Sequence, residues 1–386
     1  MLEYLNQYGN VSFSQAPMND VDLAIFAELV YCPLERIARP EGLSLEELPA
    51  ALEQPGEPDV TQVRFQYQMR DQQRLRQALV QARRYENVRV KAFRHTFDDP
   101  GQIQFAALAL DVEGAATVVY RGTDNTLAGW KEDFNLAYME HIPAQKMAVS
   151  FLEEMLADAK EGRVCGHSKG GNLAAYAAIH IPERLQHTRL LDAYNNDGPG
   201  FRKDVTDTEE YRRVAEKLHT YIPASSIVGV LLEHTEDYVV VASNSHAVMQ
   251  HEPLTWGVQG RQFIRREERS ELGKVSDDVL RQWIASMTRE EREEFSAALF
   301  DMFTQGGKLR SLEEVKQVDL LRRLAADDKQ KGIVSEIVRR LMSDVKDEFL
   351  RSAEEGLKET AETLKETAGN LYQAGQKALE RRKEEK

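Results

Sequence analysis

After Arg121 the chain alternates between short apolar runs and longer segments with helical spacing, and this alternation constrains the fold more than any other feature. In chain order the segments are 144–159 (helix), 162–166 (strand), 169–181 (helix), 189–197 (strand), 207–218 (helix), 219–224 (strand) and 237–243 (strand). Such alternation predicts an α/β fold, a doubly wound and largely parallel sheet with helices on both faces. Ligands of these sheets bind beyond the carboxyl ends of the strands.

The flanking segments differ in character. Upstream, residues 87–95, 103–111 and 116–122 are typical of strands, and residues 20–32 and 71–85 have helical spacing. Beyond about Phe263 the chain turns to charged helical segments without a strand pattern. We therefore predict two units: residues 1–262, an α/β domain with a helical N-terminal segment, and residues 263–386, a helical extension that ends in a charged amphipathic tail.

The tail contains a narrow heptad stripe. Leu357, Leu364 and Leu371 recur every seven residues, with Ala361 and Ala368 between them. This spacing is compatible with self-association or with docking on a protein partner. It is equally compatible with a solvated single helix.

Composition narrows the class of protein. The chain is 42% hydrophobic and 30% charged, and no run approaches the roughly 20 apolar residues of a membrane span. Its start lacks the basic and apolar regions of a secretory signal, and the two cysteines, Cys32 and Cys165, form no disulfide or metal framework. We therefore expect a cytoplasmic protein without stable membrane insertion. The net charge of −14 disfavours nucleic acid as a partner.

The stretch GHSKGG carries the clearest chemical signal. Ser168 lies between Gly166 and Gly170 at the spacing G-x-S-x-G, directly after a predicted strand and before a predicted Ala-rich helix. This is the context of a nucleophile elbow, in which a sharp turn exposes the serine. The backbone N–H of Lys169, at the start of the helix, is then a candidate donor to an oxyanion. The alternative is a serine that only caps the helix.

Two groups of motifs resemble the fungal-type, class three triacylglycerol lipases. The first matches an apolar strand ending in Arg-Gly-Ser/Thr and a Trp-x-x-Asp helix start, and the second matches Gly-His-Ser-x-Gly-Gly. The matching residues are Arg121, Gly122, Thr123, Trp130, Asp133, Gly166, His167, Ser168, Gly170 and Gly171. GHSKGGNLA, DGPGF, SSIVG and MQHxPxxW further resemble a bacterial branch of this lipase-like superfamily.

The resemblance covers about residues 20–259 and implies an α/β-hydrolase fold that hydrolyses carboxylic esters. It implies that Ser168 is the nucleophile and that Thr123 supplies an oxyanion N–H, with Asp133 holding the Thr123 hydroxyl. A serine hydrolase of this kind needs no cofactor or metal. A small acyl ester or lipid-like molecule is the expected substrate.

The family's acid position is occupied differently here. Where the lipases carry Asp in a D-I-V-P stretch, this chain has Ser226, and a serine cannot stabilise an imidazolium as a carboxylate does. Asp197, at the end of the preceding predicted strand, is our first candidate for the acid, and Glu233 and Asp237 are alternatives. The alternative is that Asp197 has no catalytic role and only forms a turn before Gly-Pro, where Asp is common.

Chain order favours a base that follows the acid. His251 lies in a turn-like stretch after the last predicted strand, while His234 and His246 compete with it. We expect His167, beside the serine, to pack or hydrogen-bond behind the turn. A second hypothesis is a weak or inactive hydrolase fold that serves as an interaction module through its helical extension.

Overall fold

The protein is described by a computed structural model that places residues 1–52, 66–98, 103–123, 136, 141–226, 228–245, 250–269 and 288. Of the predicted extension, residues 263–386, only residues 263–269 and 288 are described, so its heptad stripe lies outside the described residues. Trp130, Asp133 and His246 also lie outside them.

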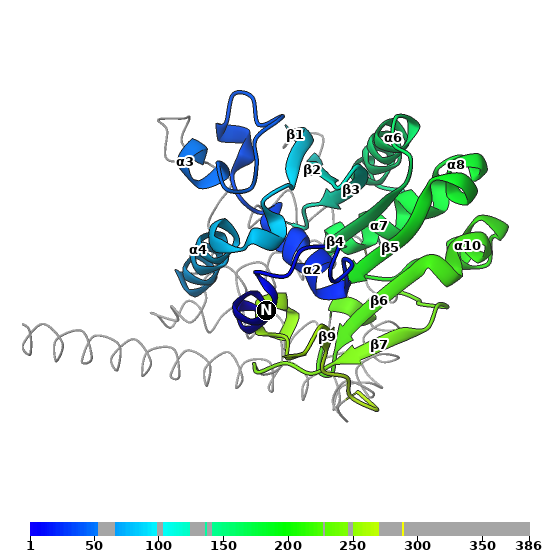
Figure 1. Ribbon diagram of the computed structural model, residues 1–386. Helices are drawn as coiled ribbons and strands as arrows, with labels where there is room; N and C mark the ends of the chain where they lie inside the picture. Colours follow the sequence, from blue (N-terminus) through cyan, green and yellow to red (C-terminus); the bar gives the residue numbers. More distant parts are fainter. Residues whose placement is uncertain are drawn as a thin grey trace, which may run out of the picture.

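Seven strands form one sheet in the same order as in the chain (Figure 1). They are β1 (Arg89–Asp98), β2 (Ile103–Val112), β3 (Ala115–Tyr120), β4 (Gly162–His167), β5 (Leu190–Asn196), β6 (Leu218–Pro223) and β7 (Tyr238–Val241). β1, β2 and β3 pair antiparallel, and β3 to β7 pair parallel. A small antiparallel pair follows, β8 (Val258–Gln259) with β9 (Gln262–Phe263).

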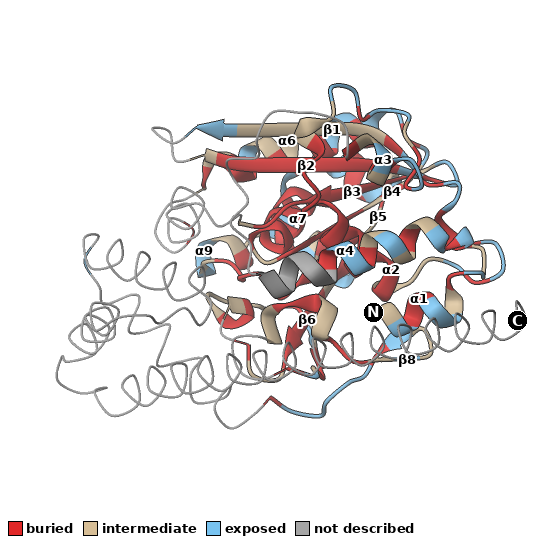
Figure 2. Cartoon of the chain, turned by 90° about the vertical axis from the view of Figure 1, so that its left-hand side faces the viewer, coloured by how far each residue is buried: buried red, intermediate tan, exposed pale blue. Residues whose placement is uncertain are grey.

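Successive residues of the central strands face opposite layers. Val118 and Val164 belong to one core cluster, whereas their neighbours Val119 and Cys165 belong to the other. Because strand side chains alternate, both faces must be covered, which explains the continuous apolar runs in the sequence. In Figure 2, strand β2 and helix α7 (Lys169–His180) are coloured as buried over most of their length.

Two groups of helices supply this cover. One face carries α6 (Pro143–Ala157), α7 (Lys169–His180), α8 (Glu183–Thr188), α9 (Lys203–Thr206) and α10 (Glu209–Val214). The other carries α1 (Leu2–Tyr8), α2 (Asp20–Leu29), α3 (Leu48–Leu52) and α4 (Gln66–Gln81). Figure 1 shows α2 and α7 on opposite sides of the sheet.

This mixed α/β architecture confirms the predicted class, but it differs from the doubly wound sheet that we expected. The described α-helices between parallel strands, α6 to α10, all pack in one core cluster, and the strand order advances without reversal. Right-handed crossovers that always step in one direction place their helices on the same face. The N-terminal helices, which precede every strand in the chain, cover the opposite face.

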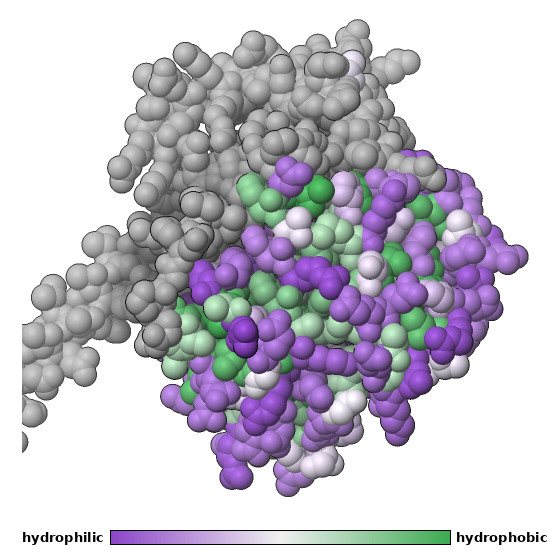
Figure 3. Space-filling model, turned by 90° about the horizontal axis from the view of Figure 1, so that it is seen from above, coloured by the Kyte–Doolittle hydropathy of each residue, from purple (hydrophilic) through white to green (hydrophobic). Residues whose placement is uncertain are grey.

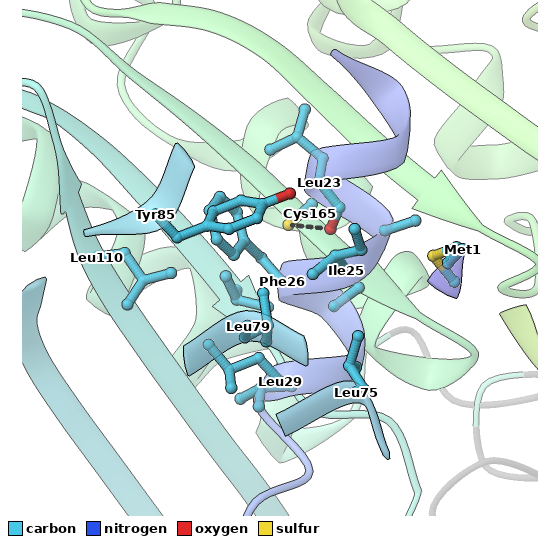
Figure 4. Packing of buried hydrophobic residues seen from close by; sticks show 14 of the residues in the cluster. Met1, Leu23, Ile25, Phe26, Leu29, Leu75, Leu79, Tyr85, Leu110 and Cys165 are labelled. Atoms are coloured by element: carbon cyan, nitrogen blue, oxygen red, sulfur yellow. Dashed lines mark hydrogen bonds between the residues drawn. The ribbon is translucent and has the colours of Figure 1, made fainter. Parts of the chain in front are cut away.

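α2 is the centre of that N-terminal layer. Asn19 caps its first turn, because its side chain accepts hydrogen bonds from the N–H groups of Val21 and Asp22. In turn, the Asp22 carboxylate accepts a hydrogen bond from the Asn19 N–H. Leu23 and Phe26 of α2 lie among Tyr85, Leu79 and Leu110 in Figure 4. The buried Cys165 thiol donates to the Leu23 carbonyl at 3.5 Å.

A buried ion pair fixes the start of the chain to the segment before β1. Arg84 Nη2 lies 2.6 Å from Asp22 Oδ2, and both side chains are fully buried. The hydroxyls of Tyr4 and Tyr85 also donate to Asp22 Oδ1. Removing one partner would leave the other charge buried, so we expect loss of either Asp22 or Arg84 to destabilise the docking of the N-terminal helices.

The outer surface agrees with the high content of charge. On the face shown in Figure 3, hydrophobic residues (green) are interspersed with hydrophilic ones (purple). Within the described part of the chain, no helix is long and apolar enough to cross a membrane.

Candidate active site

Ser168 occupies a sharp turn between β4 and α7. Its backbone has φ 58° and ψ −133°, a left-handed conformation that costs a non-glycine residue energy and that clusters at functional sites. Its N–H donates to the Asn196 carbonyl at 3.0 Å, and its own carbonyl accepts from Gly171 N–H at 2.8 Å. Ser168 is partly exposed between buried neighbours, His167 and Lys169.

The surrounding glycines are required by close backbone approach. A Cβ on Gly166 would lie 2.1 Å from the Gly170 carbonyl oxygen, and a Cβ on Gly170 would lie 2.2 Å from the Tyr120 carbonyl oxygen. β4, the start of α7 and the end of β3 are therefore packed main chain against main chain. This packing keeps Ser168 in its strained turn.

Asp197 and His251 come together at the same edge of the sheet. Asp197 directly follows β5, whose last residue, Asn196, is opposite His167 in the parallel register. His251 Nδ1 lies 2.8 Å from Asp197 Oδ2. An ionised carboxylate only accepts, so Nδ1 carries the hydrogen and, in the neutral ring, Nε2 is left as an acceptor.

The Asp197 carboxylate is fully buried. Burial raises its pKa above the ordinary 3.8, and this effect outweighs the hydrogen bond and the charge of His251, the Ser226 side chain and the Arg269 charge, which all lower the pKa. Asp197 also has a φ of 53°, and its Oδ1 makes no hydrogen bond of standard geometry within the described residues. Such an environment is costly to the fold and is typical of functional sites.

Ser226 lies beside this carboxylate rather than replacing it. Its side chain lowers the pKa of Asp197, and its hydroxyl oxygen also accepts from the Gly229 N–H at 3.1 Å. Its carbonyl accepts from Arg269 Nη2 at 2.7 Å. The position that resembles the lipase acid is therefore part of the surroundings of Asp197.

The loop after β3 passes next to the serine. A Cβ on Gly122 would lie 3.1 Å from the Ser168 Cβ and 2.6 Å from the His167 carbonyl oxygen. Thr123 is the next residue, partly buried, and the described part of this loop ends there. Gly122, the residue before Thr123, is thus packed directly against the turn that carries Ser168.

The Lys169 side chain is linked through Gln104 to the same loop after β3. Its buried ammonium donates to the carbonyl and the side-chain oxygen of Gln104, at 2.9 and 2.7 Å. The Gln104 amide in turn lies 3.4 Å from the Gly122 carbonyl oxygen. The sequence analysis considered only the Lys169 N–H and missed this side-chain link, because nothing in the local pattern pairs residue 169 with residue 104.

The loop that follows Asp197 is also held. Asn195 accepts from Gly198 N–H at 2.8 Å, and Asn172 donates to the carbonyls of Pro199 and Gly200 at 3.2 and 2.9 Å. A Cβ on Gly198 would lie 2.3 Å from the Ser168 carbonyl oxygen. The DGPGF stretch is therefore packed directly against the serine turn.

The competing candidates lie elsewhere. The Glu233 backbone pairs with Phe201, and Asp237 is exposed. His234 Nδ1 donates at 2.9 Å to Glu236, a carboxylate that the sequence analysis did not single out. His246 and Asp133 cannot be compared because both are outside the described residues.

Glu236 forms its own polar cluster. Burial alone would raise the pKa of Glu236, but hydrogen bonds from His234, Thr220 and Tyr211 prevail and lower it to about 2. Thr220 Oγ1 lies 2.6 Å from one carboxylate oxygen, and the Tyr211 hydroxyl donates to the other. Among the described residues, His234 Nδ1 therefore has a carboxylate partner different from that of His251.

His167 lies behind the serine turn, as expected, but it has a specific partner. Its Nε2 is 2.7 Å from the carbonyl oxygen of His251, and the two rings are 4.5 Å apart between centroids. Its Nδ1 is 3.4 Å from the Tyr31 hydroxyl and 3.4 Å from Glu28 Oε1. These contacts join residues from the N-terminal layer to the edge of the sheet that carries Ser168.

Comparison with known proteins gives a family. The Mbeg1-like family matches residues 79–301, which is more than half of the 386 residues. The chain belongs to the Mbeg1-like family. This is a lipase-like family, and the Mbeg1-like region contains Ser168, Asp197 and His251, whereas α1 and α2 precede it. No curated protein matches the chain.

Proposed function

We propose that this protein is a serine hydrolase of the α/β-hydrolase type that cleaves carboxylic acyl esters, with Ser168 as nucleophile, His251 as base and Asp197 as acid. One observation carries the proposal. A buried carboxylate holds Nδ1 of His251 at 2.8 Å, at the sheet edge where Ser168 occupies its strained turn. A nucleophile, a base and a group that orients the base are the parts that acyl transfer requires.

In this mechanism the Asp197 carboxylate fixes the tautomer of His251. Nε2 then accepts the Ser168 proton as Oγ attacks the ester carbonyl, and Asp197 stabilises the imidazolium that forms. The imidazolium returns its proton to the leaving alcohol, which leaves an acyl group on Ser168. Water, activated by the same imidazole, hydrolyses this acyl-enzyme and regenerates the serine.

The tetrahedral intermediate needs donors for its oxyanion. We assign this role to the backbone N–H groups of Lys169, at the start of α7, and of Thr123, in the loop that Gly122 brings beside Ser168. One such donor contributes about 10² to 10³ in rate. Asp133 as the group that orients Thr123 is part of the proposal through the resemblance alone.

The rival hypothesis, an inactive fold used as an interaction module, explains the acid less well. Burial raises the pKa of Asp197, so the ionised carboxylate weakens the fold at neutral pH. A binding module gains nothing from such a residue, whereas a triad requires it. The strained backbone of both Ser168 and Asp197 supports the same preference.

The proposal extends to setting and substrate. Cys32 and Cys165 are both buried and neither forms a disulfide, which fits a reducing, cytoplasmic compartment. A dispersed small acyl ester or lipid-like molecule is the proposed substrate, because a net charge of −14 disfavours anionic lipid aggregates. The C-terminal extension is the proposed site of any self-association or protein partner.

Hydrolysis of p-nitrophenyl esters of increasing acyl length tests this function. We expect turnover by the wild-type protein and a loss of at least about 10³-fold in Ser168→Ala. Ser150→Ala, on the exposed face of α6, is the control and should keep full activity. Folded wild-type protein that hydrolyses none of the esters, or Ser168→Ala at the wild-type rate, would contradict the proposal.

A further inference from the structure

We infer that His167 is a positioning residue that sets the distance between the nucleophile and the base, an inference that rests on the proposed function. His167 is adjacent to Ser168 in the chain and hydrogen-bonds to the main chain of His251. The residue next to the nucleophile therefore holds the segment that carries the base.

The direction of this hydrogen bond is fixed by its acceptor. A backbone carbonyl only accepts, so His167 Nε2, 2.7 Å from the His251 oxygen, must carry a hydrogen. The His167 side chain is 7% exposed, so the donor end of this part-buried bond has little access to water. A buried donor is costly to leave without its acceptor.

The other side of the His167 ring is held by the N-terminal layer. Tyr31 and Glu28 each place an oxygen 3.4 Å from Nδ1. Gln72 Nε2 donates to the second oxygen of Glu28 at 2.5 Å, and Glu28 is almost fully buried. The ring therefore cannot turn away from His251 without breaking its contacts with Glu28 of α2 and with Tyr31, which follows α2 in the chain.

His251 is thus fixed at two points. Asp197 holds its side chain at Nδ1, and His167 holds its main chain at the carbonyl. The neighbouring Gln250 is anchored separately, since its side-chain oxygen accepts from Ser225 N–H and its carbonyl accepts from Trp256 Nε1. Removing the His167 bond leaves the segment attached but frees His251 to shift relative to Ser168.

A shift of about 1 Å in a reacting group costs about 10²-fold in rate. His167→Phe keeps an aromatic ring and removes the donor, so kcat should fall by about 10²-fold while KM stays within about twofold. His167→Gln places an amide N–H at a similar distance and should restore kcat to within about fivefold of wild type. His180→Phe is the matched control, because His180 Nδ1 also bonds to a carbonyl, that of Tyr176, at 2.9 Å but away from the site.

The experiment measures kcat and KM for a p-nitrophenyl ester, with thermal unfolding to verify that each variant is folded. Loss of kcat in His167→Phe with recovery in His167→Gln supports the positioning role. Two outcomes would overturn the positioning role while leaving the serine hydrolase intact. One is a kcat of folded His167→Phe equal to that of wild type, and the other is an equal loss of kcat in His167→Phe and His167→Gln. If folded wild-type protein hydrolyses no ester, the proposed function fails first and this inference falls with it.

Discussion

Replacement of Asp197 by Asn tests the acid of the proposed triad quantitatively. The carboxylate oxygen lies 2.8 Å from His251 Nδ1, which places the centres of the two charges about 4 Å apart once the imidazolium forms. At an effective dielectric constant of about 20, the attraction between them is about 4 kcal/mol. Asp197→Asn removes this attraction from the transition state and should lower kcat by about 10³-fold.

The assay is steady-state hydrolysis of a p-nitrophenyl ester at pH 7. Asp192→Asn is a matched control, because Asp192 lies on β5, the strand that Asp197 directly follows, and makes its own histidine pair, with His219 at 3.0 Å. We expect Asp192→Asn to stay within about twofold of wild type. Activity of folded Asp197→Asn within about threefold of wild type would refute the assignment of the acid.

The same variant has an opposite expected effect on stability. Since burial raises the pKa of Asp197, the protonated carboxyl is more favourable in the folded protein than in the unfolded chain. That stability is fully present below the ordinary pKa of 3.8 and is lost as pH rises through the raised value. Urea unfolding should therefore show Asp197→Asn gaining stability relative to wild type between pH 4 and pH 7, and a relative loss over this interval would contradict the account.

Three further predictions concern the stability of the fold. Gly166→Ala would place its Cβ 2.1 Å from the Gly170 carbonyl oxygen. We therefore expect this variant to lose ester hydrolysis and, in urea unfolding, more than about 3 kcal/mol of unfolding free energy. An active variant of wild-type stability would contradict this. Asp22→Asn leaves Arg84 buried without its ion pair and should cost about 3 to 5 kcal/mol in the same measurement, whereas a change below about 1 kcal/mol would argue against the pair. Glu236, whose pKa is lowered from 4.5 to about 2, stabilises the fold above pH 4.5, and this contribution is lost as pH falls through about 2. Glu236→Gln should thus cost about 3 kcal/mol at pH 7 and progressively less toward pH 2, so a cost independent of pH would show that the lowered pKa is wrong.

The sequence predicted the parts of the fold that depend on local pattern. The alternation after Arg121 located β4, α7, β5 and β6, and G-x-S-x-G predicted the turn at Ser168. The sequence did not predict that the helices between the parallel strands lie on one face of the sheet, because this depends on which other segment covers the opposite face. α2 occupies one face through contacts with residues far along the chain, such as Cys165.

The site divides in the same way. Asp197 and His251 could be proposed because strand ends and chain order restrict the candidates. Their choice over Glu233 and His234 required the structure, which pairs Asp197 with His251 and gives His234 a different carboxylate. The bond from His167 to His251 joins residues 84 positions apart, and no short sequence pattern indicates such a contact.

Labelling with a fluorophosphonate probe is the most direct test of the central claim, because the probe reacts only with a serine that a base has activated. Intact mass and peptide mapping should show one adduct, on Ser168, in the wild-type protein. Labelling should disappear in Ser168→Ala and fall by at least about 10²-fold in rate in His251→Ala. Folded wild-type protein that takes up no probe, or that carries the adduct on another serine, would contradict the account.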